Sequence, residues 1–311
     1  MNNPGFNQAI FKKFGNLELL AKQVVEGFIT GLHKSPFHGF SVEFAEHKIY
    51  NQGESTRHID WKLFARSEKL FVKCFEEETN LRCHIIIDNS SSMYFPLENK
   101  SPEQFNKLEF SVMSAASLMY LMNKQRDAVG LSIFSNKVDS HYKARSNSTH
   151  QKMLFAHLNS IIKRENQPLN KLSATAESLH LLAESLHKRS LVIVFSDMLV
   201  NAEDPAEVFS ALKHLKHNKH EVILFHVYDK QKELKFDFTN RPLRFIDMET
   251  GKEIKLNPGG IKEKYQNALS DYFKTLKMKC LQYHIDFVDA DINEGFEKVL
   301  FSFLIKRARL F

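Results

Sequence analysis

The chain has 311 residues, 43% hydrophobic and 26% charged, which is enough to bury one large core or two modest ones. The 43 lysines and arginines are interspersed with 37 acidic residues, so the net charge of +6 favours a mildly basic solvated surface over specific nucleic-acid binding. No start resembling a signal peptide and no apolar run long enough to cross a bilayer is present in the sequence. We therefore expect no transmembrane segment and a cytoplasmic location. The cysteines (Cys74, Cys83 and Cys280) form no CxxC pair, which fits a reducing compartment.

Residues 1–80 are predicted to form an N-terminal helix and a β-rich addition. Between residues 36 and 80, short apolar and polar positions alternate, as they do in edge or hairpin strands. The segment 39–66 is dense in charge. It could be a partner-docking surface, but a structural ion-pair network holding a small β-subdomain is the favoured interpretation. The residues on which both interpretations rest are Arg57, Asp60, Trp61 and Arg66.

From residue 81 onward, predicted strands and helices alternate. This alternation indicates a mostly parallel sheet with helices on both faces, because parallel strands need crossover connections. The run 83–88 is typical of a strand covered on both faces, and the helix after it is predicted to start with a capping box at 101–104. Further strands are expected at 129–134, 137–142, 191–195, 221–227 and 284–288, and further helices at 149–163, 175–188, 204–215, 258–281 and 295–307.

One stretch interrupts this alternation. Residues 233–257 contain two turn signals, Asn-Arg-Pro at 240–242 and Glu-Thr-Gly at 249–251, which predict an inserted hairpin. The predicted organisation is therefore an N-terminal addition over 1–80, followed by an α/β domain over 81–311 that carries this hairpin.

Polar side chains follow two of the predicted buried strands. Asp88, Ser90 and Ser92 come at the end of the first strand, and Asp197 follows the strand 191–195. Thr175 precedes a predicted helix between them and could bring a third hydroxyl to the same edge, where open α/β sheets bind ligands.

Two carboxylates and three hydroxyls are hard oxygen donors, which suit Mg²⁺ or Mn²⁺ and not zinc or copper. Because hydroxyl ligands are neutral, a dication held chiefly by them keeps most of its charge and can attract a partner's carboxylate. The alternative is structural, since Asp and Ser after a strand often cap the next helix. The second aspartate and Thr175 favour the metal site.

The motif Asp88-x-Ser90-x-Ser92, followed by Thr175 and Asp197, resembles the metal-ion-dependent adhesion site of von Willebrand factor A domains. From about Leu32 to the C-terminus the chain also resembles a bacterial family called domain of unknown function 58. The residues that carry this second resemblance are Gly39-Phe-Ser-Val-Glu-Phe44, Tyr50-x-x-Gly53-Glu54-x-x-Arg57-x-Ile59-Asp60-Trp61, Ala65-Arg66, Asp88-Asn-Ser-Ser-Ser-Met93, Phe195-Ser-Asp197 and Ile246-Asp247-x-Glu249-Thr-Gly251.

The resemblance implies an α/β fold of the von Willebrand factor A-like (Rossmann-like) type and association with a MoxR-type AAA+ ATPase or its client. It also implies direct hydroxyl ligation by Ser90, Ser92 and Thr175, with Asp197 acting through water. Two departures stand out: Glu54 replaces the usual aspartate, and Ser173-Ala174 replaces glycines that commonly precede the threonine.

Other motifs point less clearly to chemistry. His214, His217 and His220 lie at a lysine-rich helix end, where we expect them to complement the helix dipole and face solvent without binding zinc. The sequence has no Gly-rich phosphate loop, GxSxG, HExxH or CxxC motif. We therefore expect a non-enzymatic, metal-dependent protein-interaction module. A metal-dependent phosphohydrolase using the same pocket and a purely structural scaffold are the alternatives.

Overall fold

A computed structural model describes residues 16–33, 47–49, 64–66, 70–73, 81–97, 105–162, 174–199, 205–295 and 297–310. The chain divides into two compact units, residues 1–28 with 81–311, and residues 29–80. In the smaller unit, β1 (His47–Ile49) pairs antiparallel with β2 (Phe71–Lys73). Of the charged segment 39–66, only residues 47–49 and 64–66 are described. Arg57, Asp60 and Trp61 lie outside the described residues.

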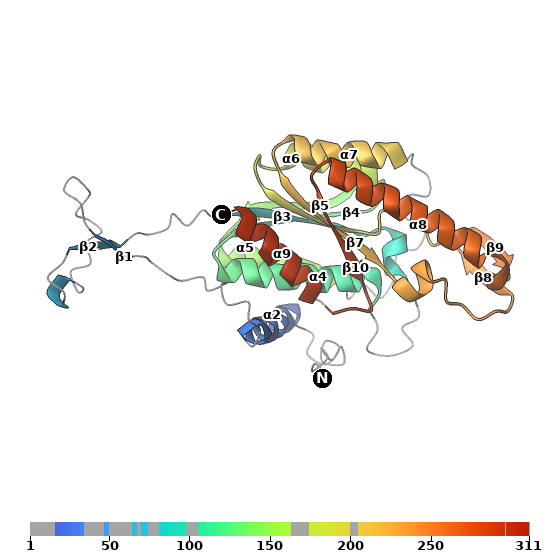
Figure 1. The fold of residues 1–311 in the computed structure, drawn as a ribbon, viewed down its shortest axis with the longest axis horizontal. Helices are drawn as coiled ribbons and strands as arrows, with labels where there is room; N and C mark the ends of the chain where they lie inside the picture. Colours follow the sequence, from blue (N-terminus) through green and yellow to red (C-terminus); the bar gives the residue numbers. More distant parts are fainter. Residues whose placement is uncertain are drawn as a thin grey trace. The chain divides into compact units, whose positions relative to one another are not determined.

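The larger unit is built on a six-stranded sheet with the strand order β10-β7-β6-β3-β4-β5 (Figure 1). Every neighbouring pair in it is parallel except β4 with β5, which is antiparallel. The expectation of a mostly parallel sheet is therefore confirmed. The strands are β3 (Arg82–Asp88), β4 (Ala128–Phe134), β5 (Val138–Arg145), β6 (Leu191–Ser196), β7 (Glu221–Tyr228) and β10 (Asp286–Asp291).

The central strands are buried on both faces, which explains their continuous apolar sequences. Ile85, Ile86 and Ile87 of β3 are all fully buried although successive side chains point to opposite faces. Because β3, β4 and β6 run parallel, their C-terminal ends lie together along one side of the sheet. We call this row of strand ends the carboxyl edge. The opposite edge, where these strands begin, is called the amino edge.

Helices cover both faces of the sheet, as Figure 1 shows: α6, α7 and α8 lie on one face and α4, α5 and α9 on the other. These helices are α4 (Lys107–Lys124), α5 (Ser148–Ile162), α6 (Thr175–Ser185), α7 (Pro205–His217), α8 (Pro258–Gln282) and α9 (Glu297–Leu310). In the described part of the chain, none has the combination of length and hydropathy that a membrane-spanning helix needs.

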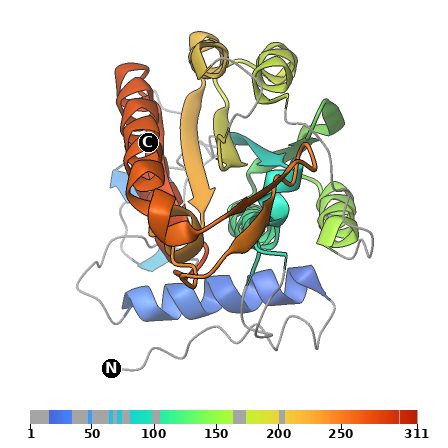
Figure 2. The ribbon, with the colours of Figure 1, turned by 90° about the vertical axis from the view of Figure 1, so that its right-hand side faces the viewer.

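An additional helix, α2 (Leu17–His33), lies outside α4 (Figure 2). Leu17, Leu20, Ala21 and Val25 form its buried stripe. Burial and the nearby carboxylates of Glu26 and Glu18 raise the pKa of Tyr120 on α4. The amphipathic spacing of α2 thus adds a further layer to the face covered by α4.

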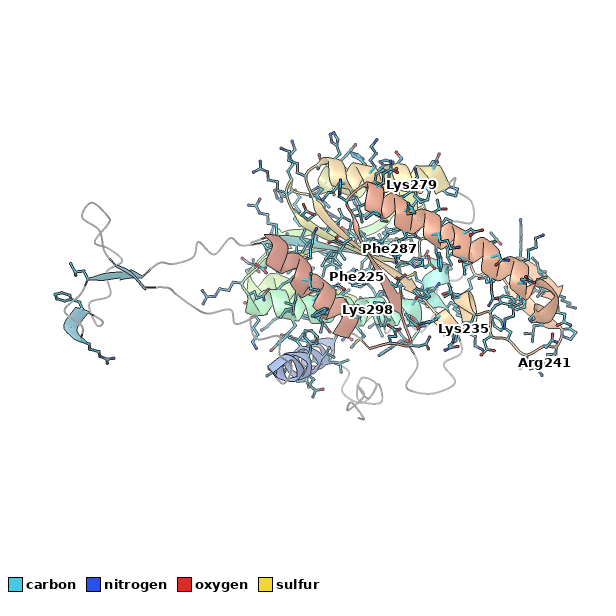
Figure 3. The ribbon with its side chains drawn as sticks, in the orientation of Figure 1. Phe225, Lys235, Arg241, Lys279, Phe287 and Lys298 are labelled. Atoms are coloured by element: carbon cyan, nitrogen blue, oxygen red, sulfur yellow. The ribbon has the colours of Figure 1, made fainter. Side chains whose placement is uncertain are left out.

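After β7 the chain forms a short π-helix, η3 (Lys230–Leu234), and then an antiparallel hairpin of β8 (Leu243–Ile246) and β9 (Glu253–Leu256). The hairpin falls within residues 233–257. It projects beyond the carboxyl edge, and Figure 3 shows Lys235 and Arg241 on the same projecting part. Phe236 joins the hairpin to α8 because its ring stacks on Phe245 and contacts Tyr265.

Two element boundaries differ from the expectation. The described helix α4 begins at Lys107, not within 101–104, and its capping box is formed by Asn106 and Glu109. A second cap signal therefore lies five residues beyond the predicted one, and residues 101–104 are outside the described part. The last strand begins at Asp286 because His284 takes a left-handed turn, with φ 55°, at the end of α8.

Candidate functional site

Asp88 ends β3 at the carboxyl edge and is almost completely buried, with 1% of its surface exposed. Its Oδ1 accepts a hydrogen bond from the Ser90 amide at 2.9 Å, and its Oδ2 accepts one from the Ser196 hydroxyl at 2.7 Å. Ser196 ends the neighbouring strand β6, so this carboxylate links two strand ends. Both partners are neutral donors, which leaves the charge of Asp88 without a counter-ion among its described contacts.

Soon after Asp88 the chain enters the 3-10 helix η2 (Ser91–Tyr94), for which Ser90 is the N-cap residue. The Ser90 and Ser92 hydroxyls lie 3.1 Å apart, close enough for one to donate to the other. Ser90 is fully buried, whereas Ser92 is partly exposed. The motif therefore presents a carboxylate and two adjacent hydroxyls from one five-residue stretch.

Asp197 follows β6 and is also buried, with 1% exposed. Its Oδ1 accepts the Leu199 amide at 3.1 Å, and its backbone carbonyl accepts a hydrogen bond from His226 Nε2 at 2.9 Å. The next residue, Met198, has φ 49° and is buried, a left-handed conformation that is uncommon for a residue with a side chain. Local strain of this kind persists only where surrounding contacts fix the backbone, as they do here.

Thr175 is the first residue of α6 and has 1% of its surface exposed. The preceding residue, Ala174, donates its amide to the Ser135 carbonyl at 3.1 Å, just beyond the end of β4. Because β4 pairs with β3 on the side opposite β6, Thr175 and Asp197 flank Asp88 from its two neighbouring strands. Ser173, which precedes Ala174, lies outside the described residues.

A lysine that sequence reasoning missed also lies at this edge. Lys107 begins α4, and its side chain is only 1% exposed. Its ammonium donates to Asp197 Oδ2 at 2.7 Å and to Glu233 Oε1 at 2.6 Å. Glu233 belongs to η3 and has a side-chain exposure of 12%. One signal was available in the sequence: a lysine in the first turn of a helix opposes the helix dipole and needs a specific reason to be there.

The electrostatics of this edge are dominated by burial. Burial, with the added repulsion of Asp197, raises the pKa of Asp88 to about 6, although its hydrogen bonds from Ser196 and Ser90 oppose the shift. Burial likewise raises the pKa of Glu233 despite the attraction of Lys107. For Lys107 burial favours the neutral form, but attraction to Asp197 and Glu233 outweighs it and raises the pKa. For Asp88 and Glu233, the effect of burial on the pKa therefore exceeds that of the stabilising contacts from the described residues.

The predicted behaviour of one histidine was wrong. His220 is fully buried, and its Nδ1 accepts the Ser190 amide at 3.2 Å, so it does not face solvent at a helix end. Burial lowers its pKa. His217 is exposed, and His214 Nδ1 lies 2.9 Å from His180 Nδ1 on α6. The chain turns sharply after α7, at Lys219 with φ 59°, and this turn places His220 beside Ser190, directly before β7 begins.

Within the described ranges, no three His, Cys, Asp or Glu side chains are grouped in a way that could hold a metal ion. A cation at the carboxyl edge would therefore depend on hydroxyl ligands in addition to Asp88 and Asp197. Ser90 and Ser92 fit that requirement because they are adjacent to each other and to Asp88. Asp197 fits it less directly, since Lys107 already binds one of its oxygens.

Comparison with known proteins gives relatives that are named as uncharacterized proteins. Uncharacterized proteins of Mycobacterium bovis and Mycobacterium tuberculosis are 24% identical over 215 residues, which cover 68% of this chain. The matched region spans 63% of the length of those relatives.

Among solved structures, BatB from Bacteroides thetaiotaomicron matches with a TM-score of 0.45 and 17% identity, covering 74% of this chain and 99% of that one. An aerotolerance-related membrane protein from Bacteroides fragilis matches with a TM-score of 0.42 and 18% identity, covering 68% and 92%. A family model also matches residues 46–272, more than half of the chain. The chain therefore belongs to the family described as protein of unknown function DUF58.

Proposed function

We propose that the chain is a non-enzymatic, metal-dependent protein-interaction module with a von Willebrand factor A-like fold. Its carboxyl edge would hold Mg²⁺, or Mn²⁺ in its place, in an adhesion-type site. The ion would bind the carboxylate of a partner protein. We further propose that this partner is a MoxR-type AAA+ ATPase or its client and that the module works in the cytoplasm.

The observation that carries the proposal is the balance of buried charge. Asp88, Asp197 and Glu233 would contribute three negative charges when ionised, and Lys107 is the one ammonium that the described part of the chain places on them. The deficit is therefore two charges, which one dication would neutralise. Since an uncompensated buried charge is costly, this imbalance favours either protonation or a bound cation.

The residue types assign the roles. Ser90, Ser92 and Thr175 would be hydroxyl ligands, and Asp88 would orient the serines through the Ser90 amide that it already accepts. Asp197 would act through water, in keeping with its engagement by Lys107. Oxygen ligands of this kind suit Mg²⁺, which commonly retains several waters and few protein carboxylates. When bound, the ion supplies a Lewis-acidic position that an incoming carboxylate can occupy.

The test is capture of a purified MoxR-type ATPase with the full chain as bait. Capture should require Mg²⁺, should be lost on adding a chelator, and should be abolished by Asp88→Ala while the circular dichroism spectrum is retained. Asp139→Ala is the matched control, because this exposed carboxylate accepts from Ser135 at the same edge without lying in the motif. Equal capture by Asp88→Ala in the presence of chelator would contradict the proposal. Mg²⁺-dependent turnover of a generic phosphoester, lost in Asp88→Asn, would favour a phosphohydrolase.

A further inference from the structure

Lys107 occupies an unusual position for a cation. It lies at the N-terminus of α4, where the helix dipole repels positive charge, and its side chain is 1% exposed. Burial of an ammonium is tolerated only when it is paired and hydrogen bonded. Asp197, which follows β6, and Glu233, in η3, supply that pairing. The ring of Phe95 lies 5.9 Å from the ammonium on a further side.

The contacts of Lys107 decide which carboxylates remain available at the edge. Asp197 receives Lys107 on Oδ2 and the Leu199 amide on Oδ1. Glu233 receives Lys107 on Oε1 and the Asp229 amide on Oε2. Both carboxylates thus have a donor on each oxygen and share one cation. Asp88 differs from these two carboxylates, because its hydrogen-bond donors in the described part of the chain, the Ser90 amide and the Ser196 hydroxyl, are neutral.

We propose that Lys107 is a specificity-determining residue, which keeps Asp197 and Glu233 away from the metal ion and so leaves the ion in need of a carboxylate from outside the chain. This inference rests on the proposed function. An ion that the neutral hydroxyls of Ser90, Ser92 and Thr175 hold, with Asp88 orienting the serines, keeps a coordination position open for a partner's Asp or Glu. Without Lys107, Asp197 is free to ligate the ion directly and satisfies it from within the chain.

The inference predicts two changes of opposite direction in Lys107→Met. The affinity for the metal alone should rise, by at least about tenfold, because one more carboxylate can bind it. The binding of an external carboxylate should fall by a similar factor. Mn²⁺ serves as the probe: electron paramagnetic resonance of free Mn²⁺ gives its affinity, and water-proton relaxivity reports the waters on the bound ion.

Acetate is the carboxylate probe. In the wild-type chain, acetate should displace water from bound Mn²⁺ and lower the relaxivity. In Lys107→Met the relaxivity should be lower from the start and insensitive to acetate. Lys306→Met is the matched control, since Lys306 also bridges two carboxylates, Glu221 and Asp286, at a position remote in the sheet from Asp88. It should behave like the wild type in both measurements.

Because Lys107→Met leaves the carboxylates unpaired and can prevent folding, a second variant keeps the inference testable. The double variant Lys107→Met with Glu233→Met removes one charge of each sign, so the buried deficit is unchanged while Asp197 is still released. If the wild-type chain binds no Mn²⁺, the proposed function itself fails. If it binds Mn²⁺ and acetate acts equally on the wild type and the double variant, the role of Lys107 is refuted and the proposed function stands.

Discussion

The two edges of the sheet both bury polar side chains, but they do so in different ways. Towards the amino edge, His84 Nε2 lies 2.7 Å from the Ser132 hydroxyl in the middle of β4, which also lies 2.8 Å from His141 Nδ1, and His220 accepts the Ser190 amide. These groups are neutral, because burial lowers the pKa values of His84, His141 and His220. At the carboxyl edge the buried groups are ionisable carboxylates with one ammonium.

The difference separates a structural network from a candidate binding site. The neutral network lines a pocket of about 10 Å³, room for about one water, together with Ser190, and the buried His141 Nε2 and His220 Nε2 have no hydrogen-bond partner within the described part of the protein. Among the residues that the structure describes, the carboxyl edge carries a deficit of positive charge. Buried polarity alone therefore says little about function, whereas an uncompensated buried charge points to a ligand.

The largest expected effect comes from removing the buried ammonium. Lys107→Met should lower the free energy of unfolding, measured in urea without metal, by about 3–5 kcal/mol because it leaves two buried carboxylates unpaired. Lys306→Met should cost only about 1 kcal/mol, since Lys306 is 12% exposed and its partners Glu221 and Asp286 are 37% and 40% exposed. Equal losses in the two variants would remove the distinction between a charged buried edge and an ordinary surface network.

A smaller effect is expected from acid at the amino edge. Burial, aided by His141 and His220, lowers the folded-state pKa of His84 to about 3. The unfolded chain binds this proton near pH 6.5 and the folded chain does not. The burial of neutral His84 therefore costs no stability above that pH. As the pH falls below it, the free energy of unfolding decreases, by about 2 kcal/mol at pH 5.

His84→Leu should flatten this pH dependence, measured as the free energy of unfolding between pH 7 and 5, by about one bound proton. A slope that is unchanged in the variant would mean that His84 is protonated in the folded protein and that the amino edge is not neutral.

The smallest effect concerns the shared hydroxyl. Ser132→Ala should cost about 1–2 kcal/mol because both His84 and His141 lose a partner in a buried environment. Ser140→Ala is the control, since that hydroxyl has one part-buried histidine partner, His157, at 3.1 Å, and it should cost less than half as much. Neither variant should alter the response of the protein to Mg²⁺, because neither hydroxyl is a proposed ligand of the ion.

Local sequence predicted the parts of the site that depend on strand topology. The apolar runs of β3 and β6 and their parallel alternation with helices were sufficient to bring Asp88 and Asp197 to the same edge. The hydroxyls of Ser90 and Ser92 followed because they are two and four residues from Asp88. These features need only periodicity and connectivity, which a single sequence carries.

Long-range pairing could not be predicted in this way. The partners of Lys107 lie 90 and 126 residues away, so only the folded chain reveals the ion pairs. The position of Lys107 also depended on where α4 begins, and the sequence carries two capping-box signals a few residues apart, of which the described one is formed by Asn106 and Glu109. His220 was misassigned because a lysine-rich helix end looks solvated, although the turn at Lys219 returns the chain to the sheet.

The most direct test of the account is the thermal shift produced by Mg²⁺ in the wild-type chain and in Asp88→Asn. A ligand that binds only the folded state must raise its stability, so saturating Mg²⁺ should raise the wild-type Tm and leave that of Asp88→Asn unchanged. Without metal, Asp88→Asn should be the more stable of the two, since burial and Asp197 raise the pKa of Asp88 to about 6 and penalise its charge at neutral pH. No shift in the wild-type chain, or an equal shift in both, would contradict the account.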